Sequence, residues 1–166
     1  WVYLNSAIAG NTPLYGYGND TGSDYFSLHL TSAGKLQWYQ HGSLSGIELT
    51  ASVGIGQWHH IALVRDGNTL KVYNNGVERI SSSYSASFPT GHVLRIGSWY
   101  NTTDYGSNGH LNGYIADYRV VNGTSVYTGA FTPPTEPLTA IENTVFLAQP
   151  YRMKPGVGNM SIASRP

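Results

Sequence analysis

The side chains best suited to binding a ligand gather between Ser98 and Asn108, in the stretch SWYNTTDYGSN. Aromatic rings stand there among amides, hydroxyls and a carboxylate. A sugar presents C–H groups that pack on an aromatic ring, and its hydroxyls pair with amides and carboxylates. Tyr15 and Tyr17, with Asp20 close by, offer the same mixture in a second segment. We therefore predict carbohydrate contacts for Trp99, Tyr100, Asn101, Asp104, Tyr105, Asn108, Tyr15 and Tyr17.

The same aromatic residues also have a structural interpretation. Tyr and Trp cover the ends of β-sandwiches, and they are enriched where subunits meet. The sequence leaves ligand binding and burial open as alternatives for these residues.

A second kind of chemistry is suggested by the six residues from Asn19 to Asp24, NDTGSD. They bring two carboxylates, an amide and hydroxyls together, which are the hard oxygen ligands that calcium takes. Asn19, Asp20 and Asp24 are therefore our candidate calcium ligands. Polar turns use the same residues for backbone reasons alone, so the alternative is a turn without metal.

The residues of nucleophilic and acid–base catalysis do not form a recognisable set. The chain contains six histidines, but no Gly-x-Ser-x-Gly elbow. His59 and His60 are adjacent in a predicted strand, so they should point to opposite faces, one packed and hydrogen-bonded, the other partly exposed. Asp117 should pair with Arg119 or cap a turn. We predict that the chain is not an enzyme.

Composition narrows the classes of partner. The chain has 166 residues, enough for one domain with a core, and nine basic residues balance nine acidic ones. Phosphate binding needs a clustered basic surplus, so we expect no nucleic-acid partner. No apolar run approaches the ~18 residues of a membrane span, so we expect no membrane insertion. The chain has no cysteine, which excludes disulfides and thiolate metal sites.

These side chains must be positioned by strands, because apolar residues recur at period two and Gly or Pro interrupts every long window. Asp66-Gly67 and Asn75-Gly76 suit tight hairpin turns. They predict a meander of three strands, at about 57–65, 69–74 and 77–80. Tyr25–Leu30 and Lys35–Gln40 should form a hairpin, with Phe26, Leu28 and Leu30 toward the core.

Further strands are expected at 1–5, 47–51 and 93–97. Leu111–Val121 should be the longest strand, and Thr144–Leu147 the last, pairing near the start of the domain. Ala9–Asp24 is expected to form a long polar loop that carries Tyr15 and Tyr17.

Two blocks of the sequence resemble laminin G-like domains of the concanavalin A-like jelly-roll superfamily. The blocks are WHHIAL with RDGN and VYNNG in 58–76, and LNGYIADYRV in 111–120. The resemblance implies an all-β fold, an antiparallel β-sandwich of concanavalin A-like jelly-roll type, over residues 1–148. Its first strands would be entered part-way, as in a piece of a longer protein. Residues 149–166 would be an extended C-terminal arm or linker.

The continuation of the second block, from Asn122 to Thr135, is most similar to versions found in bacteriophage tail and virion-surface proteins. This implies a non-enzymatic virion surface module, of a tail fibre, appendage or capsid decoration. It would bind a host-surface glycan or dock to neighbouring viral subunits, as a homo-oligomer or part of a larger assembly.

Other functions stay open within the resemblance. The module could be a purely structural virion protein, or an extracellular carbohydrate-binding or adhesion domain of a cellular protein. Many such domains bind calcium at a loop rim, which adds to the case for Asn19–Asp24. Polysaccharide hydrolases of the superfamily carry two acids two positions apart on one strand. No two acids here have that spacing, so a hydrolase is the last alternative.

Overall fold

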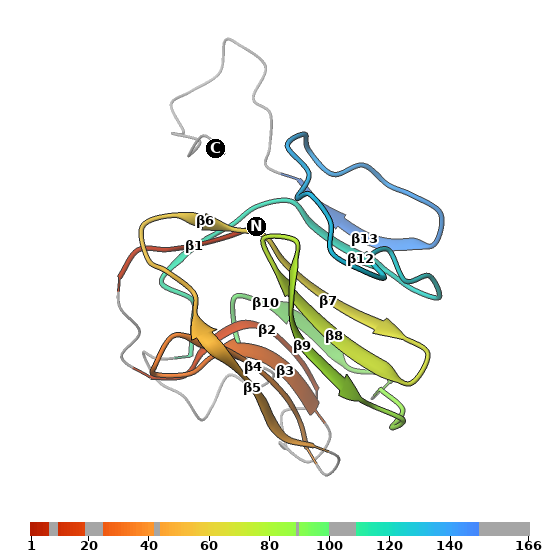
Figure 1. Cartoon of the computed structure of the whole chain (residues 1–166), viewed down its shortest axis with the longest axis horizontal. Coiled ribbons are helices and arrows are strands. Elements are labelled where there is room, and N and C mark those ends of the chain that lie inside the picture. The colour runs from red at the N-terminus through yellow and green to blue at the C-terminus, as the bar shows by residue number, and fades with distance from the viewer. Residues whose placement is uncertain (7–9, 19–24, 42–43, 89, 100–108, 150–166) are drawn as a thin grey trace.

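The computed structural model describes residues 1–6, 10–18, 25–41, 44–88, 90–99 and 109–149, with 44–52 described as backbone alone. Among these residues all regular structure is β, in antiparallel strands (Figure 1), which confirms the all-β prediction. No helix in this part of the chain could span a membrane. The strands are β1 (Val2–Leu4), β2 (Thr12–Gly18), β3 (Tyr25–Leu30), β4 (Lys35–Gln40), β5 (Leu44–Ser52), β6 (Trp58–His59), β7 (Ile61–Asp66), β8 (Thr69–Asn74), β9 (Val77–Ser83), β10 (Val93–Ile96), β11 (Gly113–Ile115), β12 (Tyr118–Val121) and β13 (Thr144–Ala148).

One layer of the sandwich is a five-stranded sheet in the order β10-β2-β3-β4-β5. The predicted hairpin of β3 and β4 is confirmed at both ends. The predicted loop over 9–24 is wrong, because β2 occupies 12–18 and pairs with β3 and β10. Pro13 and two glycines gave this segment the composition of a loop, and pairing on both edges overrides that preference.

The opposite layer consists of short sheets, one of which joins strands from distant parts of the chain. The meander β7-β8-β9 is confirmed, and β1 lies between β6 and β11 in a second sheet. The predicted strand at 57–65 is divided at His60, whose N–H donates to the Asn75 side chain instead of a neighbouring strand (2.8 Å). The predicted strand at 111–121 is divided at Asp117, where φ is +51°.

The C-terminal strand does not pair where the sequence suggested. β13 pairs with β12, whereas β1 takes its partners from β6 and β11. The expectation that the last strand joins the first is therefore wrong.

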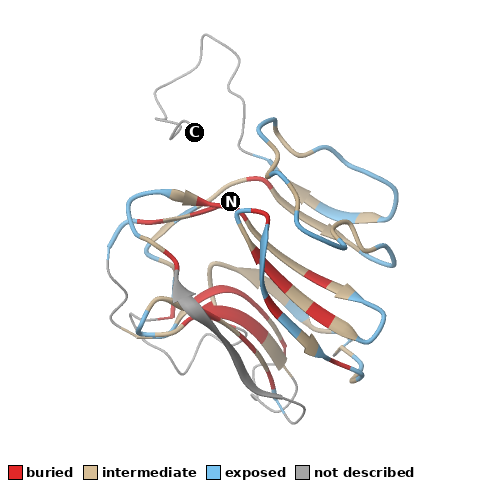
Figure 2. Ribbon diagram, in the orientation of Figure 1, coloured by how far each residue is buried: buried red, intermediate tan, exposed pale blue. Residues whose placement is uncertain are grey.

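The hydrophobic core lies between the two layers (Figure 2). The predicted inward set is confirmed: Leu28 and Leu30 are buried, and Phe26 packs against them. The short sheets contribute Val2 and Leu4 from β1 and Leu70 and Val72 from β8, while Trp38 comes from β4.

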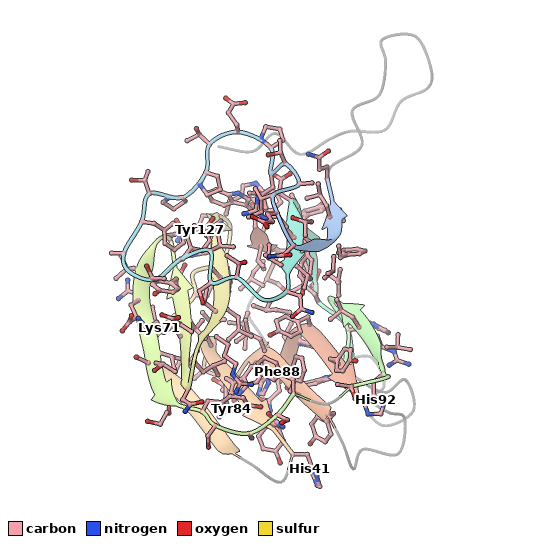
Figure 3. The ribbon with its side chains drawn as sticks, turned by 90° about the vertical axis from the view of Figure 1, so that its right-hand side faces the viewer. His41, Lys71, Tyr84, Phe88, His92 and Tyr127 are labelled. Atoms are coloured by element: carbon pink, nitrogen blue, oxygen red, sulfur yellow. The ribbon has the colours of Figure 1, made fainter. Side chains whose placement is uncertain are left out.

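A segment that we call the strap, residues 122–137, crosses the outer face of the β7-β8-β9 sheet. The Phe131 N–H donates to the Gly76 carbonyl (3.0 Å), and the Lys71 ammonium donates to the Thr128 carbonyl (3.0 Å). The rings of Tyr127 and Phe131 stack with centroids 3.6 Å apart, and Phe131 also contacts Tyr73. Figure 3 shows Tyr127 and Lys71 on this side of the molecule. The strap thus packs over the outer face of the meander around Lys71, Tyr73 and Gly76.

Candidate binding surface on the five-stranded sheet

The outer face of the five-stranded sheet carries the side chains that alternate with the core residues. On β3 these are Tyr25, Ser27 and His29, and on β4 they include Gln37 and Tyr39. Ser27 and His29 are as buried as the core residues, at 0% and 4% exposed. Ser27 and His29 are therefore shielded from solvent, although they lie on the side of the sheet that faces away from the core.

Ser27, His29 and Gln37 form a hydrogen-bonded chain that we call the polar trio. The Nε2 of His29 lies 2.8 Å from Oε1 of Gln37, and its Nδ1 lies 3.1 Å from the Ser27 hydroxyl oxygen. An amide oxygen only accepts, so Nε2 carries the proton and Nδ1 accepts from Ser27. Burial lowers the pKa of His29, while the bond to Gln37 partly opposes this. The trio therefore holds a neutral imidazole with both nitrogens bonded.

Trp99 covers the polar trio. Its ring centroid is 5.0 Å from that of His29, and the residue is 5% exposed. Backbone contacts hold the chain here, with a bridge between Ser98 and His110. Trp99, predicted as a glycan contact, thus packs its buried ring on His29 and does not offer an open platform.

Tyr15 and Tyr17 point to the opposite side of the sheet. Both alternate with Gly16 and Gly18, and pairing opposite Leu28 and Phe26 places their rings on the core side. Tyr15 is 9% exposed, and burial raises its pKa well above the ordinary value. The structure therefore corrects the prediction that these two rings lie in a polar loop, because it places them in β2 on the core side of the sheet.

Tyr17 is held by its neighbours. It stacks on Phe26 at 5.2 Å, and its hydroxyl accepts a hydrogen bond from the His92 N–H (3.2 Å). Both contacts give it a structural role at the edge of the core.

The remaining predicted site residues lie outside the described residues. They are Tyr100, Asn101, Asp104, Tyr105 and Asn108 of the glycan set, and Asn19, Asp20 and Asp24 of the calcium set. Within the described residues, no three His, Asp or Glu side chains come together as a metal site.

An aromatic strip at the end of the same sheet was not predicted. Tyr25 and Tyr39 stack with centroids 5.6 Å apart and planes 28° apart, and Tyr25 lies 5.5 Å from the ring of His41. Both tyrosines are half-buried and His41 is exposed, at the lower edge of the molecule in Figure 3. The outward alternation of Tyr25 and Tyr39 was visible in the sequence, but their approach depends on the register of β3 and β4.

The chemistry of this face favours binding over catalysis. In a serine nucleophile triad, a carboxylate orients the histidine and stabilises its cationic form. Gln37 stands where that acid would be, and its neutral amide cannot supply the charge. The polar trio therefore orders the sheet surface without activating Ser27.

The other residues considered for chemistry are structural. His59 and His60 do point to opposite faces, but both are buried, at 5% exposed, which corrects the expected partial exposure of one. His60 contacts Trp1, Tyr127 and Phe131. Burial, then the positive charges of the N-terminus and Arg119, lowers the pKa of His60 to about 4.

Asp117 is buried in the turn between β11 and β12, and not in mid-strand as predicted. The guanidinium of Arg119 donates to the Thr139 carbonyl (2.9 Å).

An antiparallel sandwich with an aromatic and polar outer face is the architecture of the β-sandwich binding domains. Comparison with known families defines the class further: the chain belongs to the concanavalin A-like lectin/glucanases superfamily, and its laminin G-like family matches residues 1–136. This confirms the resemblance that the sequence suggested. No curated protein matches the chain.

Two solved structures are similar to this chain. Domains LG4-5 of the mouse laminin alpha1 chain match 66% of this chain and 30% of that chain, with 17% identity and a TM-score of 0.50. An S-layer domain-containing protein (residues 221-444) of Clostridium thermocellum matches 80% of this chain and 63% of that one, with 22% identity and a TM-score of 0.29. The chain thus spans under a third of the laminin structure, and that likeness supports the fold alone.

Proposed function

We propose that the chain is a non-catalytic module that binds carbohydrate at the surface of the particle or cell that displays it. The observation that carries this proposal is the aromatic strip of Tyr25, Tyr39 and His41 beside the polar trio. Its rings offer stacking faces, and His41 and the tyrosine hydroxyls offer hydrogen bonds to sugar hydroxyls. Membership of a superfamily named for lectins and glucanases supports carbohydrate as the class of ligand.

Loop residues predicted from the sequence would extend this surface. Trp99 lies on it, and the residues that follow Trp99 are proposed to add contacts, on sequence grounds alone. Calcium binding by Asn19, Asp20 and Asp24 is proposed on sequence grounds alone.

The setting that we propose is a virion surface, as part of a tail fibre, tail appendage or capsid decoration. Support comes from the resemblance of residues 122–135, within the strap, to bacteriophage virion proteins. Many copies on one particle would multiply weak single sites into firm attachment. An adhesion domain of a cellular surface protein is the alternative setting.

A second candidate function is docking to another subunit, without glycan binding. β13 pairs only with β12 among the described residues, and it exposes Val145 (64%) and Phe146 (41%), with Ile141 (40%) nearby. An edge strand with exposed apolar side chains is a common contact between subunits. Sedimentation of the wild type and of Phe146→Ala tests this function, because docking between copies predicts an oligomer that the variant weakens.

The test of carbohydrate binding is a glycan array with and without a calcium chelator, followed by titration in solution. We expect Tyr39→Ala to weaken binding at least about fivefold, as removal of a central ring in an interface does. Phe146→Ala removes an exposed ring from another surface and should bind normally. Absence of binding to every glycan, or equal binding by Tyr39→Ala and the wild type, would reject the proposal.

A further inference from the structure

A second row of aromatic side chains crosses the sheet of β6, β1 and β11. Tyr3 of β1 pairs directly with Trp58 of β6 on one side and with Tyr114 of β11 on the other. Directly paired residues of an antiparallel sheet share a face. The ring centroid of Tyr3 lies 5.5 Å from that of Trp58 and 5.9 Å from that of Tyr114.

This row faces outward. Val2 and Leu4, the chain neighbours of Tyr3, are buried in the core at 6% and 1% exposed, so alternation places Tyr3 outside. Tyr114 is 52% exposed, and Tyr3 and Trp58 are half-buried. We call these three rings the aromatic row.

The strap covers the neighbouring part of this layer and leaves the row uncovered. Its rings reach His60, with Tyr127 and Phe131 at 6.0 and 5.5 Å, and His60 in turn contacts Trp1 at 5.2 Å. Neither strap ring has a contact with the aromatic row among the described residues. The row is therefore a continuation of an aromatic face whose other half packs against the protein's own chain.

Amide groups border the aromatic row. Asn5 follows β1 and Asn112 precedes β11, both are exposed, and the Asn5 N–H donates to the Asn112 carbonyl (3.1 Å). The Asn5 amide donates to Oδ1 of Asn112 (3.3 Å), and the Asn112 amide donates to the Ser6 hydroxyl (3.0 Å). A side-chain amide has two donors and two acceptor positions, so both keep capacity for a ligand.

We propose that the aromatic row, with Asn5 and Asn112, is a second carbohydrate site that takes a single chain of neutral sugar units. None of its five side chains is charged, which matches a neutral glycan and not an acidic one, for which Arg or Lys would be needed. The ring plane of Tyr3 is inclined at 59° to that of Trp58 and at 55° to that of Tyr114. They suit a twisted chain and not the flat face of a crystalline polysaccharide.

This site has a consequence for function. The aromatic row and the aromatic strip of Tyr25, Tyr39 and His41 lie on outer faces of opposite layers. One copy of the protein would therefore bind two glycan chains and bridge them. The inference rests on the proposed function for its class of ligand, but it uses none of the same residues.

The experiment uses indole N–H resonances of the full chain in an NMR titration with neutral hexaoses of glucose, mannose, galactose and N-acetylglucosamine. The four tryptophans report separately: Trp58 on the second site, Trp99 on the first, Trp38 on the core and Trp1 on the strap. We expect at least one hexaose to move the Trp58 resonance. Tyr114→Ala should weaken that response about fivefold or more, with Trp99 unaffected.

Val77→Ala, which shortens an exposed side chain of β9 (47% exposed) outside both surfaces, should leave both responses unchanged. A Trp58 resonance that stays in place with every hexaose up to about 10 mM, enough to fill a site with a Kd near 1 mM, would overturn the second site. A Trp58 shift that Tyr114→Ala does not weaken would overturn it as well. A Trp99 resonance that stays in place while Trp58 moves would count against the first surface and support the second.

Discussion

A single methyl group added at Gly76 should break the contact between the strap and the meander. Gly76 closes the β8–β9 turn with φ at +78°, and a Cβ there would overlap the Phe131 carbonyl oxygen and lie 2.9 Å from its carbonyl carbon. The obstacle is backbone, so a side-chain rotation cannot relieve it. We predict that Gly76→Ala displaces the strap around Phe131.

The expected loss of stability has separate contributions. Left-handed backbone costs alanine about 1–2 kcal/mol relative to glycine. Losing the Phe131–Gly76 hydrogen bond costs about 1 kcal/mol. Separating the Phe131 ring from His60 and Tyr73 costs about 1–3 kcal/mol. Together they predict a decrease of about 3–6 kcal/mol in the free energy of unfolding.

A matched control separates the cost of backbone strain at the glycine from the cost of losing the strap contact. Gly67, in the other turn of the meander, also has positive φ (+58°), but nothing lies within 4 Å of a Cβ there. Gly67→Ala should therefore cost about 1–2 kcal/mol, for backbone strain alone.

Urea unfolding at pH 7 measures both variants. Phe131→Ala should cost much less in the Gly76→Ala background than in the wild type, because both changes remove the same contact. Equal losses for Gly76→Ala and Gly67→Ala would refute this account of the strap.

Three further predictions concern polar groups. Ser27→Ala removes the hydroxyl that donates to His29 and should lower the free energy of unfolding by about 1–2 kcal/mol in urea titrations; an unchanged midpoint would contradict the polar trio. His60 has a pKa of about 4 in the folded protein against 6.5 ordinarily, so its contribution is complete above pH 6.5 and is lost as the pH falls toward 4. His60→Phe should flatten that part of the stability–pH curve, and a curve parallel to that of the wild type would show that other groups cause the loss. If calcium binds at 19–24, millimolar calcium should raise the Tm of the wild type and not that of an Asp20→Asn, Asp24→Asn variant; a wild type that does not respond would remove calcium from the proposal.

The sequence predicted the elements whose signals are local. β3, β4 and β8 begin and end at the predicted residues, and the Asn75-Gly76 turn has positive φ at both positions, as two-residue hairpins need. In these segments, alternation and turn residues agree with the tertiary pairing.

The sequence was insufficient where a distant residue or a neighbouring strand determines the local structure. Trp58 to Arg65 is apolar on both alternating sets, so nothing in it marks the division at His60, which arises from the side chain of Asn75 fifteen residues away. β2 contains proline and glycine, and only its two neighbouring strands make it regular.

The candidate site was predicted less well than the fold. Trp99 was predicted as a glycan contact and its ring is buried against His29, while Tyr15 was assigned to a loop and lies in the core. The aromatic strip and the aromatic row were missed because their members come from different strands. Residues such as Tyr3 and Tyr114, 111 positions apart in the chain, meet only through strand register.

The position of β1 between two partners determines how the domain would carry mechanical force. A pull on the N-terminal side is borne by two rows of hydrogen bonds at once, to β6 and to β11. A pull on the C-terminal side reaches β13 first, which among the described residues pairs with β12 alone, and then the strap. The C-terminal end should therefore detach at lower load and lengthen the linkage, while the sandwich that bears both aromatic surfaces stays folded. In a module under shear at a surface, detachment of the C-terminal end would take up extension before the sandwich unfolds.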